Sequence, residues 1–113
     1  MARNRTKVAL AALLVATGAG AASAHPCDDD ALSRAEPLLR LHFSAEDSTP
    51  VSIDDTVKQL PPVKALKGDG KFDVLEVWGH IYKADYRMRF LYAQIPDACV
   101  LMGQEILEAS DPY

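Results

Sequence analysis

Three histidines, two cysteines and a set of serines and carboxylates are the residues of this chain that could take part in chemistry. A serine hydrolase needs a serine nucleophile beside a histidine base, and His42 and His80 are the candidate bases. The sequence carries no G-x-S-x-G, H-E-x-x-H or phosphate-loop motif, and Gly68-Asp69-Gly70 lacks the Gly-Lys-Ser/Thr ending of a P-loop. A small hydrolase is therefore an alternative that no motif supports.

The first 24 residues have the pattern of a bacterial export signal. Basic residues open the segment, an apolar run covers residues 8–15, and Ala22-Ser23-Ala24 forms the small-x-small site that a signal peptidase cuts. The apolar run is shorter than the roughly 20 residues that span a bilayer. We expect cleavage after Ala24, a single domain at residues 25–113, a periplasmic or secreted location and no stable membrane insertion.

Cys27 and Cys99 are the only cysteines of the chain. In an oxidising compartment two cysteines have one intramolecular pairing, and their spacing is not the C-x-x-C of a redox or metal site. We therefore expect a structural disulfide that joins the two ends of the exported domain.

Cleavage after Ala24 would make His25 the amino-terminal residue, whose amine and imidazole could together chelate copper or zinc. His42 or His80 could supply a further ligand. This arrangement is similar to the histidine brace of copper monooxygenases and to the amino-terminal histidine of some periplasmic copper carriers, a resemblance that covers one residue. It implies a metal or small-ligand carrier as a second alternative function.

The charge of the chain argues against two classes of partner. The chain carries 12 Lys and Arg against 16 Asp and Glu, a net charge of −4. Loss of residues 1–24 would leave nine basic residues against 16 acidic ones, a net charge of −7. Nucleic acid and anionic membrane surfaces are poor partners for such a domain. A basic protein partner is compatible with this charge, although solubility alone would explain the same balance.

Apolar residues at three- and four-residue spacing over residues 31–42 predict an amphipathic helix. Three aspartates at residues 28–30 suit its amino terminus, where they can cap free N–H groups and meet the positive end of the helix dipole. Pro37 lies inside this pattern and lacks the N–H that a helix interior needs. We expect a kink or break near Glu36.

The middle of the chain has weaker patterns. Ser52 followed by Asp55 resembles a capping box, which predicts a short second helix that Pro61-Pro62 ends. Residues 63–66 are expected to form a brief strand that leads into a turn at residues 67–70.

From Phe72 onward the apolar period changes to two, which predicts strands. We expect one strand at residues 72–82, a second at residues 86–95 after a connection at residues 83–85, and a third at residues 99–107. Even-numbered residues of the first two strands then share a face, so five aromatic residues are expected to form one patch: Trp78, Tyr82, Tyr86, Phe90 and Tyr92.

This aromatic patch has two interpretations. It is either a docking surface or the core that the helix covers, since aromatic faces of small sheets are usually core. In the second case Arg87 and Arg89 face solvent and form a basic strip with Lys83.

The expected fold is α+β: an amino-terminal helix packed on a three- to four-stranded antiparallel β-meander, stapled by one disulfide. No motif is specific enough to name a family. The leading functional hypothesis is an exported, non-catalytic protein-binding module of the inhibitor or accessory-subunit type that uses a sheet face or edge. The candidate binding residues are Trp78, Tyr82, Tyr86, Arg87, Arg89, Phe90 and Tyr92.

Overall fold

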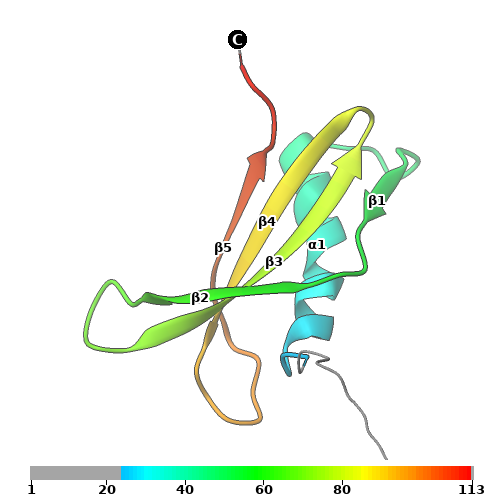
Figure 1. Cartoon of the computed structure of the whole chain (residues 1–113). Helices are drawn as coiled ribbons and strands as arrows, with labels where there is room; N and C mark the ends of the chain where they lie inside the picture. Colours follow the sequence, from blue (N-terminus) through cyan, green and yellow to red (C-terminus); the bar gives the residue numbers. More distant parts are fainter. Residues whose placement is uncertain (1–23, 113) are drawn as a thin grey trace, which may run out of the picture.

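A computed structural model describes residues 24–112, so the predicted export signal lies outside the described residues except for Ala24. One helix packs on one face of a five-stranded antiparallel sheet (Figure 1). The elements are α1 (Asp28–Phe43), β1 (Val51–Ile53), β2 (Lys58–Lys64), β3 (Lys71–Ile81), β4 (Ala84–Ala93) and β5 (Leu101–Glu108). The predicted α+β fold is confirmed, with more strands than expected.

The helix α1 buries a stripe of residues at four-residue spacing against the sheet. Its first turn holds the three aspartates, but the amino-terminal cap residue, Cys27, makes no side-chain capping bond. The helix continues through Pro37 to Phe43, so the expected break is wrong. Buried residues lie on both sides of the proline, and their packing holds the helix despite one missing hydrogen bond. They are Ala31, Ala35 and Leu39.

The short second helix expected after Ser52 is wrong, because this segment forms β1 and β2 instead. Both strands pair with the same edge of β3, one after the other. Val51 and Ile53 pack against the core, and this burial outweighs the local capping pattern. Pro61-Pro62 lies at a register shift within β2, on an edge strand, where a missing N–H is tolerated.

The β3–β4 hairpin closes with a two-residue turn at Tyr82-Lys83, because Ile81 pairs with Ala84. The predicted three-residue connection is wrong. One residue of difference in turn length moves every side chain of one strand to the other face of the sheet. Odd-numbered residues of β3 therefore share a face with even-numbered residues of β4. Tyr82 has a φ of 53°, a conformation for which glycine or asparagine is the usual signal.

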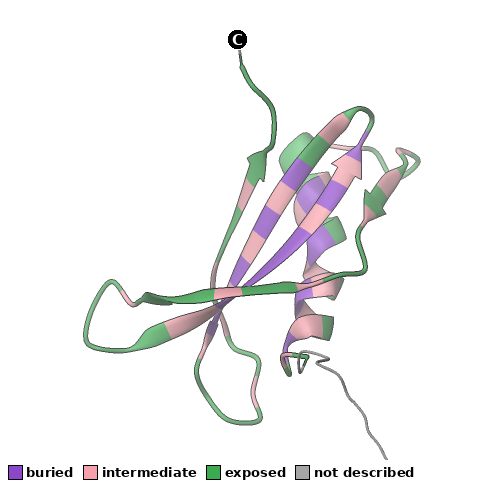
Figure 2. Cartoon of the chain, viewed as in Figure 1, coloured by how far each residue is buried: buried purple, intermediate pink, exposed green. Residues whose placement is uncertain are grey.

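The core lies between α1 and one face of β3 and β4. Buried and half-buried residues alternate along β4, as a strand with one covered face requires (Figure 2). The Tyr92 hydroxyl reaches from the sheet to the helix and donates a hydrogen bond to Asp30 at 2.7 Å. Burial, together with this bond, raises the pKa of the Tyr92 hydroxyl. The buried strand residues under α1 are Leu75, Val77, Ile81, Tyr86, Met88, Phe90 and Tyr92.

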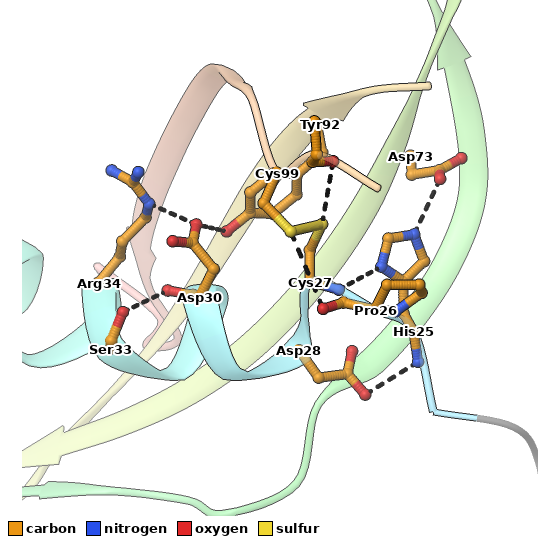
Figure 3. The surroundings of a disulfide bond; sticks show 11 residues. His25, Pro26, Cys27, Asp28, Asp30, Ser33, Arg34, Asp73, Tyr92 and Cys99 are labelled. Carbon is orange, nitrogen blue, oxygen red and sulfur yellow. Dashed lines mark hydrogen bonds and ion pairs between the residues drawn. A yellow bond between two sulfur atoms is a disulfide. The ribbon is translucent and has the colours of Figure 1, made fainter. Parts of the chain in front are cut away.

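The predicted disulfide between Cys27 and Cys99 is confirmed, with the two Cα atoms 5.6 Å apart (Figure 3). It joins the start of α1 to the loop between β4 and β5. The bond fixes the helix to the end of the sheet where β4 leaves the core.

Candidate functional site

The face of the sheet opposite α1 has no second layer in the described part of the chain (Figure 1). The register of β3 with β4 places the following residues on this open face: Val74, Glu76, Trp78, His80, Asp85, Arg87, Arg89 and Leu91. Cross-strand pairing arranges them in rows, and neighbouring rows differ in chemistry.

One row crosses four strands with alternating charge: Lys58, Glu76, Arg89 and Glu105. The Glu76 residue is only 6% exposed. Its carboxylate accepts hydrogen bonds from Arg89 Nε at 2.9 Å and from Trp78 Nε1 at 3.0 Å. Burial raises the pKa of Glu76, but these bonds outweigh it and hold the pKa below its ordinary value. Glu76 therefore finds its counter-charges inside the chain.

The basic strip expected from Lys83, Arg87 and Arg89 is not formed. Arg87 and Arg89 each approach Glu105 at 3.7 Å, and the Nε of Arg87 lies 4.0 Å from Glu76. Two carboxylates therefore face the two guanidinium groups and neutralise them. Lys83 lies in the β3–β4 turn, separate from this network.

An apolar row lies beside the charged one. It contains Leu60, Val74 and Leu91 and ends on β5 at Gly103, where no atom lies within 4 Å of the position that a Cβ would take. The sheet is hollowed here, with two adjoining depressions of about 370 and 450 Å³. Val63, Leu91 and Glu105 line both depressions. We call this region the apolar hollow: Leu60, Val63, Phe72, Val74, Leu91 and Met102.

One lysine, Lys64, lines the apolar hollow, and three more lie on the same β2–β3 hairpin, which projects away from α1 (Figure 1). Lys64 and Lys71 are directly opposite each other, an arrangement that repulsion between like charges disfavours. At the tip, Leu66 is fully exposed. Four lysines of this hairpin have no carboxylate at ion-pair distance among the described residues: Lys58, Lys64, Lys67 and Lys71.

The five aromatic residues predicted to share one patch lie in three places. Tyr86, Phe90 and Tyr92 are buried under α1, so their face is the core, as the second interpretation expected. Trp78 lies on the open face, and Tyr82 lies in the turn and is largely exposed. The two-residue turn causes this separation.

The three histidines are not brought together. The His42 ring stacks edge-on against Tyr86, with ring centroids 5.7 Å apart, while His25 hydrogen-bonds Asp73. Asp73 and His80 lie near opposite ends of β3, on opposite faces of the sheet. Within residues 24–112, no group of three or more potential ligands is placed to hold one metal ion.

His80 is held by two carboxylates. Its Nδ1 lies 2.7 Å from Asp85 and its Nε2 lies 2.9 Å from Asp54. These two hydrogen bonds, the Asp85 bond first, raise the pKa of the imidazole. Ser52 is the cross-strand neighbour of His80, yet both imidazole nitrogens already bond to carboxylates. The geometry thus provides no serine–histidine pair for nucleophilic catalysis among the described residues.

Comparison of the chain with protein-family models, curated proteins and solved structures finds no match. Among the described residues, no helix combines the length and the apolar character needed to cross a bilayer.

Sequence reasoning missed the residues of the apolar hollow because the predicted register placed Leu91 and Val74 on different faces. Two signals were visible in the sequence. Four lysines fall within residues 58–71, which is unusual in an acidic chain, and Gly103 lies inside a predicted strand. Only the fold shows that these two signals meet at one hollow.

Proposed function

We propose that this chain is an exported, non-catalytic binding module that holds an acidic segment of a protein partner in the apolar hollow. The observation that carries the proposal is the juxtaposition of the apolar hollow, in which Val63 and Met102 are exposed, with lysines that have no carboxylate at ion-pair distance among the described residues. At one border of the hollow, Glu105 lines both depressions and, together with Glu76, balances Arg87 and Arg89. A partner would therefore cover the part of the open face beside the lysine hairpin, where the positive charge is not balanced.

The charge of the hairpin specifies the partner more closely than the net charge does. A net charge of −7 is compatible with a basic partner, but the hairpin beside the hollow carries four lysines. Lys58 lies on the open face, Lys64 lines the hollow, and none of the four has a carboxylate at ion-pair distance among the described residues. Coulomb interactions fade over about 8 Å at physiological salt, so the local charge decides docking at this surface. An acidic segment with an aliphatic side chain for the hollow matches both features.

The disulfide supports the exported location. Such bonds form and persist in oxidising compartments and are rare where glutathione keeps thiols reduced. The Cys27–Cys99 bond is intramolecular and leaves no free cysteine in the described residues.

Site-directed photo-crosslinking in the exported fraction tests the surface. We would replace Met102, which lines the hollow, by p-benzoylphenylalanine and make the same replacement at Leu41, an exposed apolar residue of α1. The proposal predicts a discrete adduct from residue 102 that Val63→Glu abolishes, and none from residue 41. Equal adducts at both positions, or no adduct at residue 102, would contradict it.

A charge-reversal pair tests the acidity of the partner once the adduct is identified. Lys64→Glu should weaken binding of the purified partner by roughly fivefold or more, and added salt should weaken wild-type binding. Lys83→Glu is the matched control, because Lys83 is an exposed lysine at the opposite end of β3. A partner that is equally sensitive to both reversals does not dock at the lysine hairpin.

A further inference from the structure

The residues just after the predicted cleavage site make an unusual set of contacts for a chain end (Figure 3). The main-chain nitrogen of His25 lies 3.1 Å from a carboxylate oxygen of Asp28. The ring Nδ1 of His25 accepts a hydrogen bond from the Cys27 N–H at 3.0 Å, and the ring Nε2 lies 2.8 Å from Asp73. Three contacts thus fix one residue, whose side chain is only 12% exposed.

The partners of His25 are themselves held in place. Asp73 accepts a second hydrogen bond from Gln94 at 2.8 Å, and Cys27 is tied to Cys99 by the disulfide. Because Nδ1 accepts from a backbone N–H, its lone pair is in use and the ring proton lies on Nε2, which donates to Asp73. Ala24, one residue earlier, is exposed, and no polar contact holds it in the described structure.

We propose that residues 25–28 form a seat for a free α-ammonium group at His25, so that removal of residues 1–24 completes an ion pair with Asp28. Hydrolysis breaks the bond between the Ala24 carbonyl carbon and the His25 nitrogen. Water supplies the hydroxyl that ends the released segment and the hydrogen that goes to nitrogen, and the amine binds a further proton at neutral pH. A neutral donor then becomes a cation 3.1 Å from an anion.

The charges around the seat favour this cation. A positive group beside a helix amino terminus is opposed by the helix dipole, but Asp28, Asp29 and Asp30 all lie in the first turn of α1. Asp30 is already engaged with Arg34 and Tyr92, while the Asp28 carboxylate bonds, among residues 24–112, only to the His25 nitrogen. The Asp28 carboxylate is therefore the one that can pair with the new α-ammonium group.

This seat competes with the copper-carrier hypothesis for the same atoms. A metal chelated by the amine and Nδ1 of His25 would have to displace Asp28 from one and the Cys27 N–H from the other. In the proposed seat, the amine nitrogen and Nδ1 of His25 both make hydrogen bonds within the domain.

Three forms of the domain test the seat: residues 25–113 with a free amine, the same residues with an acetylated amine, and residues 24–113. All three contain the complete core and both cysteines. Acetylation removes the charge and leaves one N–H on the nitrogen, as in the peptide bond of the uncleaved chain. The free-amine form should melt about 3–5 °C higher than the acetylated form at pH 6. The additional Ala24 should lower the melting temperature similarly, because it moves the ammonium one residue away from Asp28.

Asp28→Asn is the deciding variant. It should abolish the difference between the free-amine and acetylated forms, whereas Asp29→Asn, which changes an exposed neighbour, should leave the difference intact. Equal melting temperatures of the two wild-type forms, or a difference that survives Asp28→Asn, would overturn the seat. Copper(II) that raises the melting temperature of the free-amine form alone would also overturn it, in favour of a metal site. Mass spectrometry of the exported protein tests the processing step separately, and any first residue other than His25 would refute that step.

Discussion

Gly79 is buried on the face of β3 that α1 covers, and its replacement tests the packing of the helix directly. A Cβ at residue 79 would lie 2.9 Å from the ends of three side chains, those of Leu39, Ile53 and Met88. Real Cβ atoms essentially never show such a distance, so the neighbours would have to move. Leu39 and Met88 are fully buried and have little room to do so.

The expected cost of Gly79→Ala follows from two opposing effects. Overpacking a filled core costs about 1–3 kcal/mol, while replacing glycine in a strand returns about 0.5–1 kcal/mol through the entropy of the unfolded chain. The net loss is about 1.2 kcal/mol, which corresponds to a fall of about 7 °C in the melting temperature of a domain of this size. Urea denaturation followed by circular dichroism measures the free energy of unfolding.

Gly103→Ala is the matched control on the other face of the sheet. Nothing lies within 4 Å of its added Cβ, so this variant should be neutral or slightly more stable than wild type. If Gly79→Ala is as stable as Gly103→Ala, α1 does not pack over residue 79 and the assignment of the two faces is wrong. Leu39→Ala in the Gly79→Ala background should cost less than Leu39→Ala alone, because the new methyl group then occupies part of the cavity.

Three further predictions concern the links within the fold. Replacing both Cys27 and Cys99 by alanine should cost about 4 kcal/mol, since their sequence separation is 72 residues, and a loss below 1 kcal/mol in urea denaturation would refute the loop-entropy argument. The pKa of His80 is raised in the folded protein, so its protonated form stabilises the fold by at most about 1 kcal/mol. This contribution is complete below the pKa of the unfolded chain and is lost as pH rises through the pKa of the folded protein. His80→Gln should therefore flatten the dependence of stability on pH between pH 6 and 8. Glu76 has a lowered pKa, so its contribution is lost as pH falls through the folded value. Glu76→Gln should cost about 1–2 kcal/mol at pH 7 and reduce the acid sensitivity of unfolding, and an unchanged acid profile would argue against the bond to Arg89.

The elements that the sequence predicted are those whose signal is local. The helix follows from apolar spacing, the disulfide from the presence of only two cysteines, and the later strands from their period of two. The turn at Tyr82-Lys83 could not be predicted, because neither residue is a usual turn former and the positive φ of Tyr82 is imposed by the flanking strands. That single position decided which side chains became core and which formed the open face.

The region after α1 was mispredicted for a different reason. Ser52 and Asp55 have the spacing of a helix cap, but Ser52 pairs with His80 in the sheet and Asp55 lies in the connection between β1 and β2. The binding surface depended on the same long-range pairing. Val63, Leu91 and Met102 come from three strands, so no local window contains the apolar hollow.

The size of the single helix explains why an unbalanced surface exists. A 16-residue helix is about 24 Å long, whereas the 11 residues of β3 extend about 37 Å. One helix therefore covers only one face of the sheet and only part of its length.

Where the open face carries Glu76 and Glu105, ion pairs keep it compatible with water without a second layer. Beyond the end of α1, the projecting part of the β2–β3 hairpin has no covering layer in the described chain, and its lysines have no carboxylate at ion-pair distance there. A lone helix on a longer sheet leaves such a region by geometry, and the sequence fills it with leucine, valine and lysine instead of balanced ion pairs. A residue choice made only for solubility would have continued the alternating charges of the neighbouring row.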